Sequence, residues 1–126
     1  MTARTPEEVH RLYEDAFNAG DIDSLLSLYE SGATFFAQPG PAMTGHTAIR
    51  EILRQFLVMK PQLEMAPAKV LTSGDLALLF SKWTMNAVGS DGESIALQGE
   101  TTDVVRRQPN GDWLLAIDNP FGLDWI

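Results

Sequence analysis

Cysteine is absent from the 126-residue chain, and basic side chains are few: nine lysines and arginines stand against seventeen aspartates and glutamates. Without cysteine there is no disulfide, no thiolate nucleophile and no cysteine-ligated zinc. The net charge of −8 repels nucleic-acid phosphates and anionic lipid headgroups, because they carry charge of the same sign. We therefore expect neither nucleic acid nor a membrane as a partner.

Long apolar runs are also missing. No run approaches the roughly 20 residues that cross a bilayer. The first twenty residues contain four acidic side chains, where a secretory leader would be apolar. We expect a cytoplasmic protein, and the length and the 44% hydrophobic composition predict a single domain over residues 1–126.

The two histidines do not point to a metal site. His10 and His46 lie far apart in the chain, and neither has a ligand-like spacing to a carboxylate. We expect His10 in solvent and His46 as a surface cap at the start of a helix. Neither a metal nor another cofactor is predicted.

What the chain does contain is a strong β-hairpin signal near its end. Two runs with alternating polarity, residues 95–107 and 113–119, flank a turn that carries Asn110 and Gly111. An Asn-Gly pair between alternating runs is typical of a tight hairpin turn. The pattern therefore predicts two long antiparallel strands.

Each of these strands carries one acid among small or apolar neighbours. Side chains alternate across a strand, so Asp103 shares its face with Thr101, and Asp118 is expected on the face of Leu114 and Ala116. If Asp103 and Asp118 lie on the same face of the sheet, both carboxyls point into one cavity.

Helical spacing of apolar residues predicts three helices, which cover residues 5–20, 21–32 and 46–59. Tyr13 lies on the buried stripe of the first helix, and Tyr29 lies on the apolar face of the second. The remaining candidates are strands: a short one at residues 33–37, one from residue 62 that Pro67 breaks, and a long one over residues 76–88. Helices first and strands later predict an α+β fold with the helices on one face of an antiparallel sheet.

The order of several short motifs resembles that of a known superfamily. These motifs are Phe17-Asn18-Ala19-Gly20-Asp21, Gly45-His46-Thr47-Ala48-Ile49-Arg50 and Gly111-Asp112-Trp113. The chain resembles nuclear transport factor 2-like (NTF2-like) proteins, specifically the small SnoaL-like and ketosteroid-isomerase-like ones. The resemblance implies a cone-shaped α+β barrel, in which three N-terminal helices wrap a curved antiparallel sheet around one deep pocket. It also implies a homodimer that forms through the outer sheet face. It does not imply an activity, because such folds carry many.

The resemblance also implies roles for particular residues. The oxyanion-hole tyrosine of ketosteroid isomerase falls on Tyr13, and its protonated aspartate falls on Asp103. The general base has no counterpart, because the matching neighbourhood reads Phe35-Phe36-Ala37-Gln38 and a neutral amide does not accept a proton at ordinary pH. We therefore expect no steroid isomerisation.

Asp118 falls where the isomerase has no acid. Two close carboxyls in an apolar cone do not both ionise readily, so one keeps its proton to higher pH, and such a pair can serve as an acid and a base. Alternatively, Asp118 only caps the exit bend at residues 118–120, and Asp103 only satisfies a buried polar group. The predicted catalytic set is Asp103 with Tyr13 or Asp118.

The remaining predicted site residues would form the pocket wall. They are Phe17, Phe35, Gln38, Phe56, Leu79, Trp83 and Met85. Two hypotheses follow for the function: a lyase or isomerase that acts on a small hydrophobic or aromatic molecule, or a non-catalytic module that binds such a molecule. A third hypothesis, a purely structural dimerisation module, would not need an acid among apolar neighbours.

Overall fold

The computed structural model describes residues 2–37 and 41–123. Its elements are, in chain order, α1 (Glu8–Asn18), α2 (Ile22–Leu26), β1 (Tyr29–Phe35), β2 (Met43–Thr44), α3 (His46–Leu57), β3 (Gln62–Ser73), β4 (Leu76–Val88), β5 (Ser94–Arg107) and β6 (Trp113–Asp118). Three helices precede the long strands, which confirms the predicted α+β class. No helix in these described ranges is both long and apolar enough to cross a membrane.

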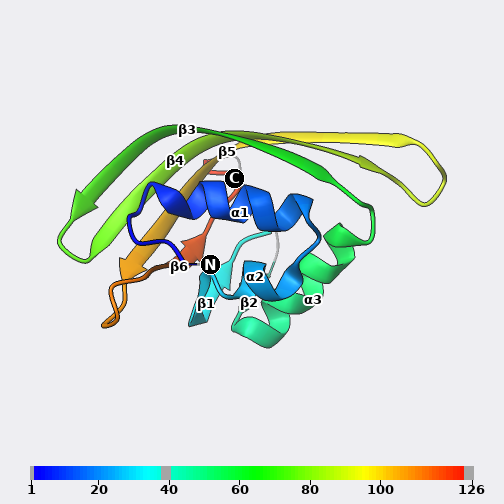
Figure 1. Ribbon diagram of the computed structural model, residues 1–126. Coiled ribbons are helices and arrows are strands. Elements are labelled where there is room, and N and C mark those ends of the chain that lie inside the picture. The colour runs from blue at the N-terminus through cyan, green and yellow to red at the C-terminus, as the bar shows by residue number, and fades with distance from the viewer. Residues whose placement is uncertain (1, 38–40, 124–126) are drawn as a thin grey trace.

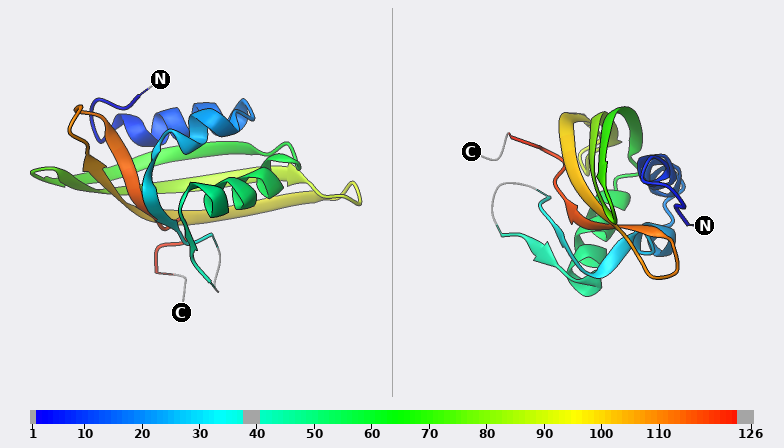
Figure 2. Two further views of the ribbon diagram at one scale, coloured as in Figure 1. Left: turned by 90° about the horizontal axis from the view of Figure 1, so that it is seen from below. Right: turned by 90° about the vertical axis from the view of Figure 1, so that its left-hand side faces the viewer.

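One curved sheet forms the frame of the molecule. Its six strands lie in the order β2-β1-β6-β5-β4-β3, and the long strands β3, β4 and β5 arch over α1 (Figure 1). Figure 2 shows the helices on the inner side of this arch. The edge strands β2 and β3 are not neighbours in the sheet. The predicted curved sheet with N-terminal helices is therefore confirmed, and this sheet is not closed into a barrel.

The sheet is antiparallel except at one place. Strand β1 pairs with β6 in parallel, with Tyr29 opposite Leu115 and Phe35 opposite Asp118. The prediction of a wholly antiparallel sheet was wrong here, because no hairpin turn joins two strands so distant in sequence and fixes their direction. The parallel pair places Phe35 beside Asp118.

The second helix is much shorter than its apolar spacing predicted. It ends at Leu26, and Tyr29 already belongs to β1. The backbone N–H of Leu115 donates to the carbonyl of Leu28 at 2.7 Å, so pairing with β6 begins where the helix was expected to continue. Sheet pairing outweighs local helical propensity at this point.

Pro67 does not end the strand in which it lies. Strand β3 runs through it, and the register with β4 shifts between Pro67 and Lys69. Because β3 is an edge strand, a bulge there accommodates a residue that has no N–H to donate.

A bulge in β6 turns Asp118 into the protein. Val104 lies opposite Ile117, but the next residue of β5, Val105, lies opposite Leu115, so Ala116 is the extra residue on β6. The extra residue reverses the alternation that follows it. Asp118 therefore points to the buried side that Leu115 also occupies, and its predicted placement on the face of Ala116 was wrong.

Strand β4 alternates as predicted, with Trp83 on the buried face. Gly99 of β5 lies opposite Trp83. A Cβ atom at this glycine would lie 2.9 Å from three atoms of the Trp83 indole, which is closer than packed carbon atoms approach. The missing side chain lets the indole lie across β5 and form part of the inner surface.

We expect Gly99→Ala to destabilise the fold by about 1–3 kcal/mol, the usual range for overpacking a filled interior. Urea denaturation followed by circular dichroism measures the change. Gly32→Ala is the matched control, because no atom lies within 4 Å of the Cβ that it adds. Equal denaturation midpoints for the two variants would contradict the proposed contact with Trp83.

Candidate functional site

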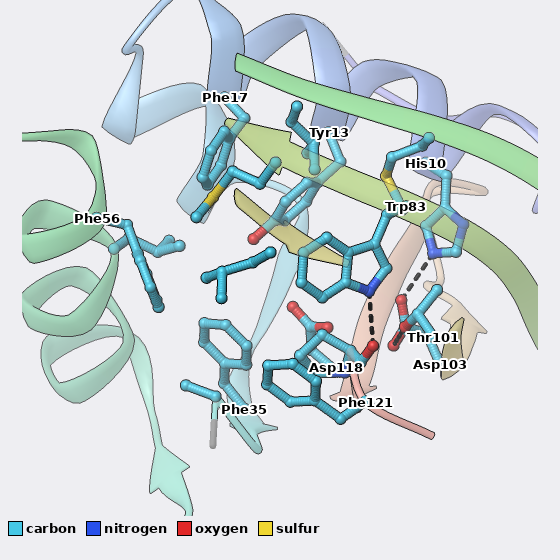
Figure 3. Close-up of a pocket in the computed structure, with 17 residues that line it drawn as sticks. His10, Tyr13, Phe17, Phe35, Phe56, Trp83, Thr101, Asp103, Asp118 and Phe121 are labelled. Carbon is cyan, nitrogen blue, oxygen red and sulfur yellow. Dashed lines mark hydrogen bonds and ion pairs between the residues drawn. The ribbon is translucent and has the colours of Figure 1, made fainter. Parts of the chain in front are cut away.

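A pocket lies between the helices and the inner face of the sheet. Its volume is about 80 Å³, and its wall is mainly apolar and aromatic (Figure 3). Trp83 Nε1 donates to the carbonyl of Pro120 at 2.6 Å, and this hydrogen bond holds the segment after β6 against the pocket. The ring of Phe121 then packs edge-on to Trp83 with centroids 5.6 Å apart.

Most of the predicted wall residues do line this pocket. Those that line it are Phe17, Phe35, Phe56, Trp83 and Met85. Leu79 is buried in the core and does not line the pocket, because the inner face of β4 extends beyond the cavity. Gln38 lies outside the described residues.

Asp103 is the best-connected polar group in the wall, and it is only 3% exposed. The Thr101 hydroxyl donates to its Oδ1 at 2.6 Å, and the backbone N–H of Asn119 donates to the same oxygen at 2.7 Å. Its Oδ2 lies 2.7 Å from Nε2 of His10. The alternation along β5 predicted the inward direction of Asp103, and three contacts now fix its orientation.

His10 corrects the sequence analysis, which placed it in solvent. The residue is 4% exposed, and its Nδ1 lies 2.6 Å from the Ser81 hydroxyl. It is buried because the face of α1 that carries it packs against the sheet, where Asp103 and Ser81 provide polar partners. A usable signal was present, since His10, Tyr13 and Phe17 recur at helical spacing on one stripe.

Tyr13, predicted to act with Asp103, bonds to Tyr29 instead. Its hydroxyl lies 3.0 Å from the hydroxyl of Tyr29, and the Tyr29 hydroxyl donates to Oδ2 of Asp118 at 2.5 Å. His10, one turn earlier on α1, is the residue of that helix that bonds to Asp103. Tyr29 was predicted on the apolar face of the second helix, but it lies in β1 and its hydroxyl contacts Asp118.

Asp118 faces the pocket and is 6% exposed. The alternative role, capping the exit bend, falls instead to Asn119. The Asn119 carbonyl accepts from the N–H of Gly122 at 3.3 Å, and its side-chain amide donates to the Gly122 carbonyl at 3.2 Å.

Burial raises the pKa of Asp118 well above the ordinary value for aspartate, and the nearby charge of Asp103 raises it further, while the hydrogen bond from Tyr29 acts in the opposite direction. Burial also raises the pKa of Tyr13 and of Tyr29 well above 10, with the charge of Asp118 as the next cause. Asp118 therefore keeps its proton to higher pH than an ordinary aspartate, and both tyrosines remain neutral phenols.

Ser81, His10 and Asp103 follow one another in the order of a hydrolase triad, but this arrangement does not support acyl transfer. Ser81 is 2% exposed and does not line the pocket, so its hydroxyl has no access to a ligand there. Nor do any three His, Asp or Glu side chains within the described ranges gather closely enough to hold a metal ion.

Comparisons with known proteins identify the fold. A family model, the SnoaL-like domain, matches residues 9–115, and no curated protein matches the chain. A ketosteroid isomerase-like protein from Erwinia carotovora atroseptica is similar with a TM-score of 0.79 and 20% identity, over 89% of this chain and 88% of that one.

Two further solved structures are similar. An NTF2-like superfamily protein from Salmonella enterica has a TM-score of 0.78 and 21% identity, over 89% of this chain and 84% of that one. A protein from Streptomyces avermitilis, provisionally named a dehydratase of the NTF2-like family, has a TM-score of 0.77 and 18% identity, over 90% of each chain. At these identities, the likeness establishes an NTF2-like fold and leaves the chemistry to the pocket.

We expect Asp118→Asn to stabilise the protein at alkaline pH and to flatten its stability against pH. A carboxyl whose pKa is raised on folding adds stability that is fully present below its unfolded pKa, near 3.8, and is lost as pH rises through the folded pKa. The amide has no charge to bury, so a gain of about 1 kcal/mol or more is expected above that pKa. Urea denaturation across pH measures it.

Asp15→Asn on the exposed side of α1 is the control, because it removes the same charge from a solvated position. Its stability should follow the pH dependence of the unmodified chain. If Asp118→Asn also follows that curve, the raised pKa of Asp118 is wrong.

Proposed function

We propose that this chain, which belongs to the SnoaL-like domain family, is an acid/base enzyme, a lyase or isomerase, that acts on a small hydrophobic or aromatic molecule. One observation carries the proposal: two buried carboxyls lie close to each other in a pocket that is otherwise largely apolar. Their surroundings differ, since Asp118 keeps its proton to higher pH while donors converge on Asp103. Such a difference provides a proton donor and a proton acceptor in one cavity.

Asp118 would act as the general acid. In its protonated form it can give a proton to a carbonyl oxygen or to a departing hydroxyl group. Asp103 would act as the general base. A carboxylate offers about four acceptor positions; His10, Thr101 and Asn119 occupy three of them, and a hydrogen bond with Asp118 occupies the fourth. That fourth position would receive the proton taken from carbon once Asp118 has given its own proton to the substrate, and His10 holds the carboxylate in place.

The size and wall of the pocket support a small substrate that is not a steroid. The volume of about 80 Å³ is below the roughly 150 Å³ of an engineered cavity that holds benzene. Ala37, in the neighbourhood that carries the base of ketosteroid isomerase, lines this pocket without an acid. A compact ring or short chain with one oxygen therefore suits the site better than a fused ring system.

A non-catalytic binding module is the second candidate. Every buried side-chain nitrogen or oxygen within the described ranges already has a hydrogen-bond partner. The buried polar side chains are therefore satisfied without a ligand, which a pocket that only binds and releases a molecule requires to be stable. Turnover decides between the two candidates.

A thermal-shift screen of short-chain and five-membered-ring alcohols and ketones, followed by product analysis of the compounds that bind, tests this choice. We expect Asp118→Asn to reduce kcat by about 10²–10⁴, the usual contribution of a general acid, while ligand binding persists. Asp15→Asn should leave kcat unchanged. Binding without turnover in the unmodified protein would favour the binding module.

We also propose that residues 1–126 act as one cytoplasmic domain that pairs with a second copy through the outer sheet face. The strand register aligns Leu71, Leu78, Val104 and Ile117 in one row across β3, β4, β5 and β6. Leu71 and Ile117 are 45% and 39% exposed. An exposed apolar row of this kind is typical of an interface, and identical copies usually pair by two-fold symmetry.

Sedimentation velocity at micromolar concentration is expected to show a dimer. Leu78→Glu should convert it to a monomer, because it would bury an unpaired carboxylate from each copy in the interface. Val58→Glu is the control, since Val58 is 73% exposed just after α3, away from this face. A monomeric unmodified protein would refute the interface.

A further inference from the structure

We propose that Tyr13, Tyr29 and Asp118 form a reversible hydrogen-bond chain whose direction decides whether the pocket offers a ligand a donor or an acceptor at Tyr13. The inference rests on the proposed role of the pocket as a ligand site, but it does not require catalysis. It adds a specificity-determining role for Tyr29, which does not itself line the pocket.

The geometry defines the chain. The hydroxyls of Tyr13 and Tyr29 are 3.0 Å apart, and either can donate to the other. The Tyr29 hydroxyl lies 2.5 Å from Oδ2 of Asp118. Tyr13 and Asp118 both line the pocket, and Figure 3 shows the Tyr13 hydroxyl directed into the space near Phe35. Tyr29 is 1% exposed and bridges the two from behind the wall.

Proton counting allows two directions. Each phenol has a single proton, so the donors along the chain must all point the same way. When Asp118 is ionised, Tyr29 donates to Asp118 and Tyr13 donates to Tyr29, which leaves only an oxygen lone pair of Tyr13 facing the pocket. When Oδ2 of Asp118 carries a proton, Asp118 donates to Tyr29 and Tyr29 donates to Tyr13, so Tyr13 presents its O–H to the pocket.

The charged and titratable groups around Asp118 come from three elements. Asp103 on β5 faces it with His10 of α1 behind, Tyr29 approaches from β1, and Tyr13 approaches from α1. No lysine or arginine lines the pocket in the part of the chain that the structure describes. Burial raises the pKa of Asp118, and Asp103 raises it further through its charge and through a side-chain hydrogen bond, while the raised pKa values of the two tyrosines keep them neutral. The chain reverses when the Asp118 proton lies on Oδ2, the oxygen that faces Tyr29.

The class of ligand follows from this reversal. With Asp118 protonated, the pocket accepts a neutral molecule that has a hydrogen-bond acceptor, such as a ketone. With Asp118 ionised, it accepts a neutral molecule that has a donor. By linkage, a ketone that binds the protonated form must also raise the apparent pKa of Asp118.

Cyclopentanone and pyrrole are matched probes, because both are five-membered rings. Cyclopentanone has a hydrogen-bond acceptor and no donor, whereas pyrrole has an N–H donor. NMR titration of each probe into the protein at a series of pH values, with the Asp118 carboxyl shift recorded in the same samples, gives its Kd on both sides of the titration of Asp118. We expect cyclopentanone to weaken, and pyrrole to tighten, by about fivefold as pH rises through the titration of Asp118, which is the order of one hydrogen bond.

Tyr29→Phe is the decisive variant, since it keeps the ring that packs against Phe35 and removes the connecting hydroxyl. It should abolish the opposite pH dependences of the two probes. The ¹³Cζ shift of Tyr13 in the ligand-free unmodified protein should titrate together with the Asp118 carboxyl, a readout that depends on no substitution.

Three results would overturn the chain: equal pH dependence of the two probes, opposite dependences that persist in Tyr29→Phe, or a failure of both probes to bind. The first would also place the Asp118 proton on the side of Asp103, where it cannot reverse the tyrosines. Failure of the hydrogen-bond chain can be distinguished from failure of the proposed enzymatic function. Opposite pH dependences of the two probes without turnover of any compound would support the chain and refute only the enzymatic function.

Discussion

The contact on which the rest of the structure depends is the Asp103 carboxylate with its three partners. His10 belongs to α1, Thr101 to β5 and Asn119 to the segment after β6, so one buried side chain joins a helix, the central strand and the exit of the sheet. A carboxylate withdrawn from water needs such partners, because leaving it unpaired costs several kcal/mol. The pocket lies where these three elements converge, and Asp103 fixes their spacing.

This arrangement has an electrostatic consequence for the second acid. Once Asp103 carries the charge and receives the donors, Asp118 lies beside it in a buried site, with a phenol as its closest partner. Three influences raise its pKa, namely burial, the charge of Asp103 and a hydrogen bond with Asp103, and they outweigh the hydrogen bond from Tyr29 that opposes them. The division of roles between the two carboxyls thus follows from which one received the stronger donors.

Local patterns predicted the features that depend on neighbouring residues. Alternation along β4 and β5 placed Trp83 and Asp103 inside correctly, and the Asn-Gly turn predicted the hairpin between β5 and β6. The errors arose where distant segments meet. His10 is buried because Asp103 and Ser81, more than 70 residues away, provide its partners, and Asp118 points inward because of a bulge in the pairing of β5 with β6. The spacing of residues along one segment predicts neither the burial of His10 nor the inward direction of Asp118.

Burying the carboxyls of Asp103 and Asp118 together costs free energy of folding, and this cost is the strongest argument that they serve a function. Two carboxyls in one cavity oppose each other, and apolar side chains of similar volume in a buried site are often as stable as paired charges or more stable. A network that lowers stability and opens onto a pocket is what a site for chemistry or selective binding requires. Asp103 therefore joins the elements around the pocket as well as serving the proposed function, whereas Asp118, whose replacement by asparagine we expect to stabilise the protein, is explained by the proposed function alone.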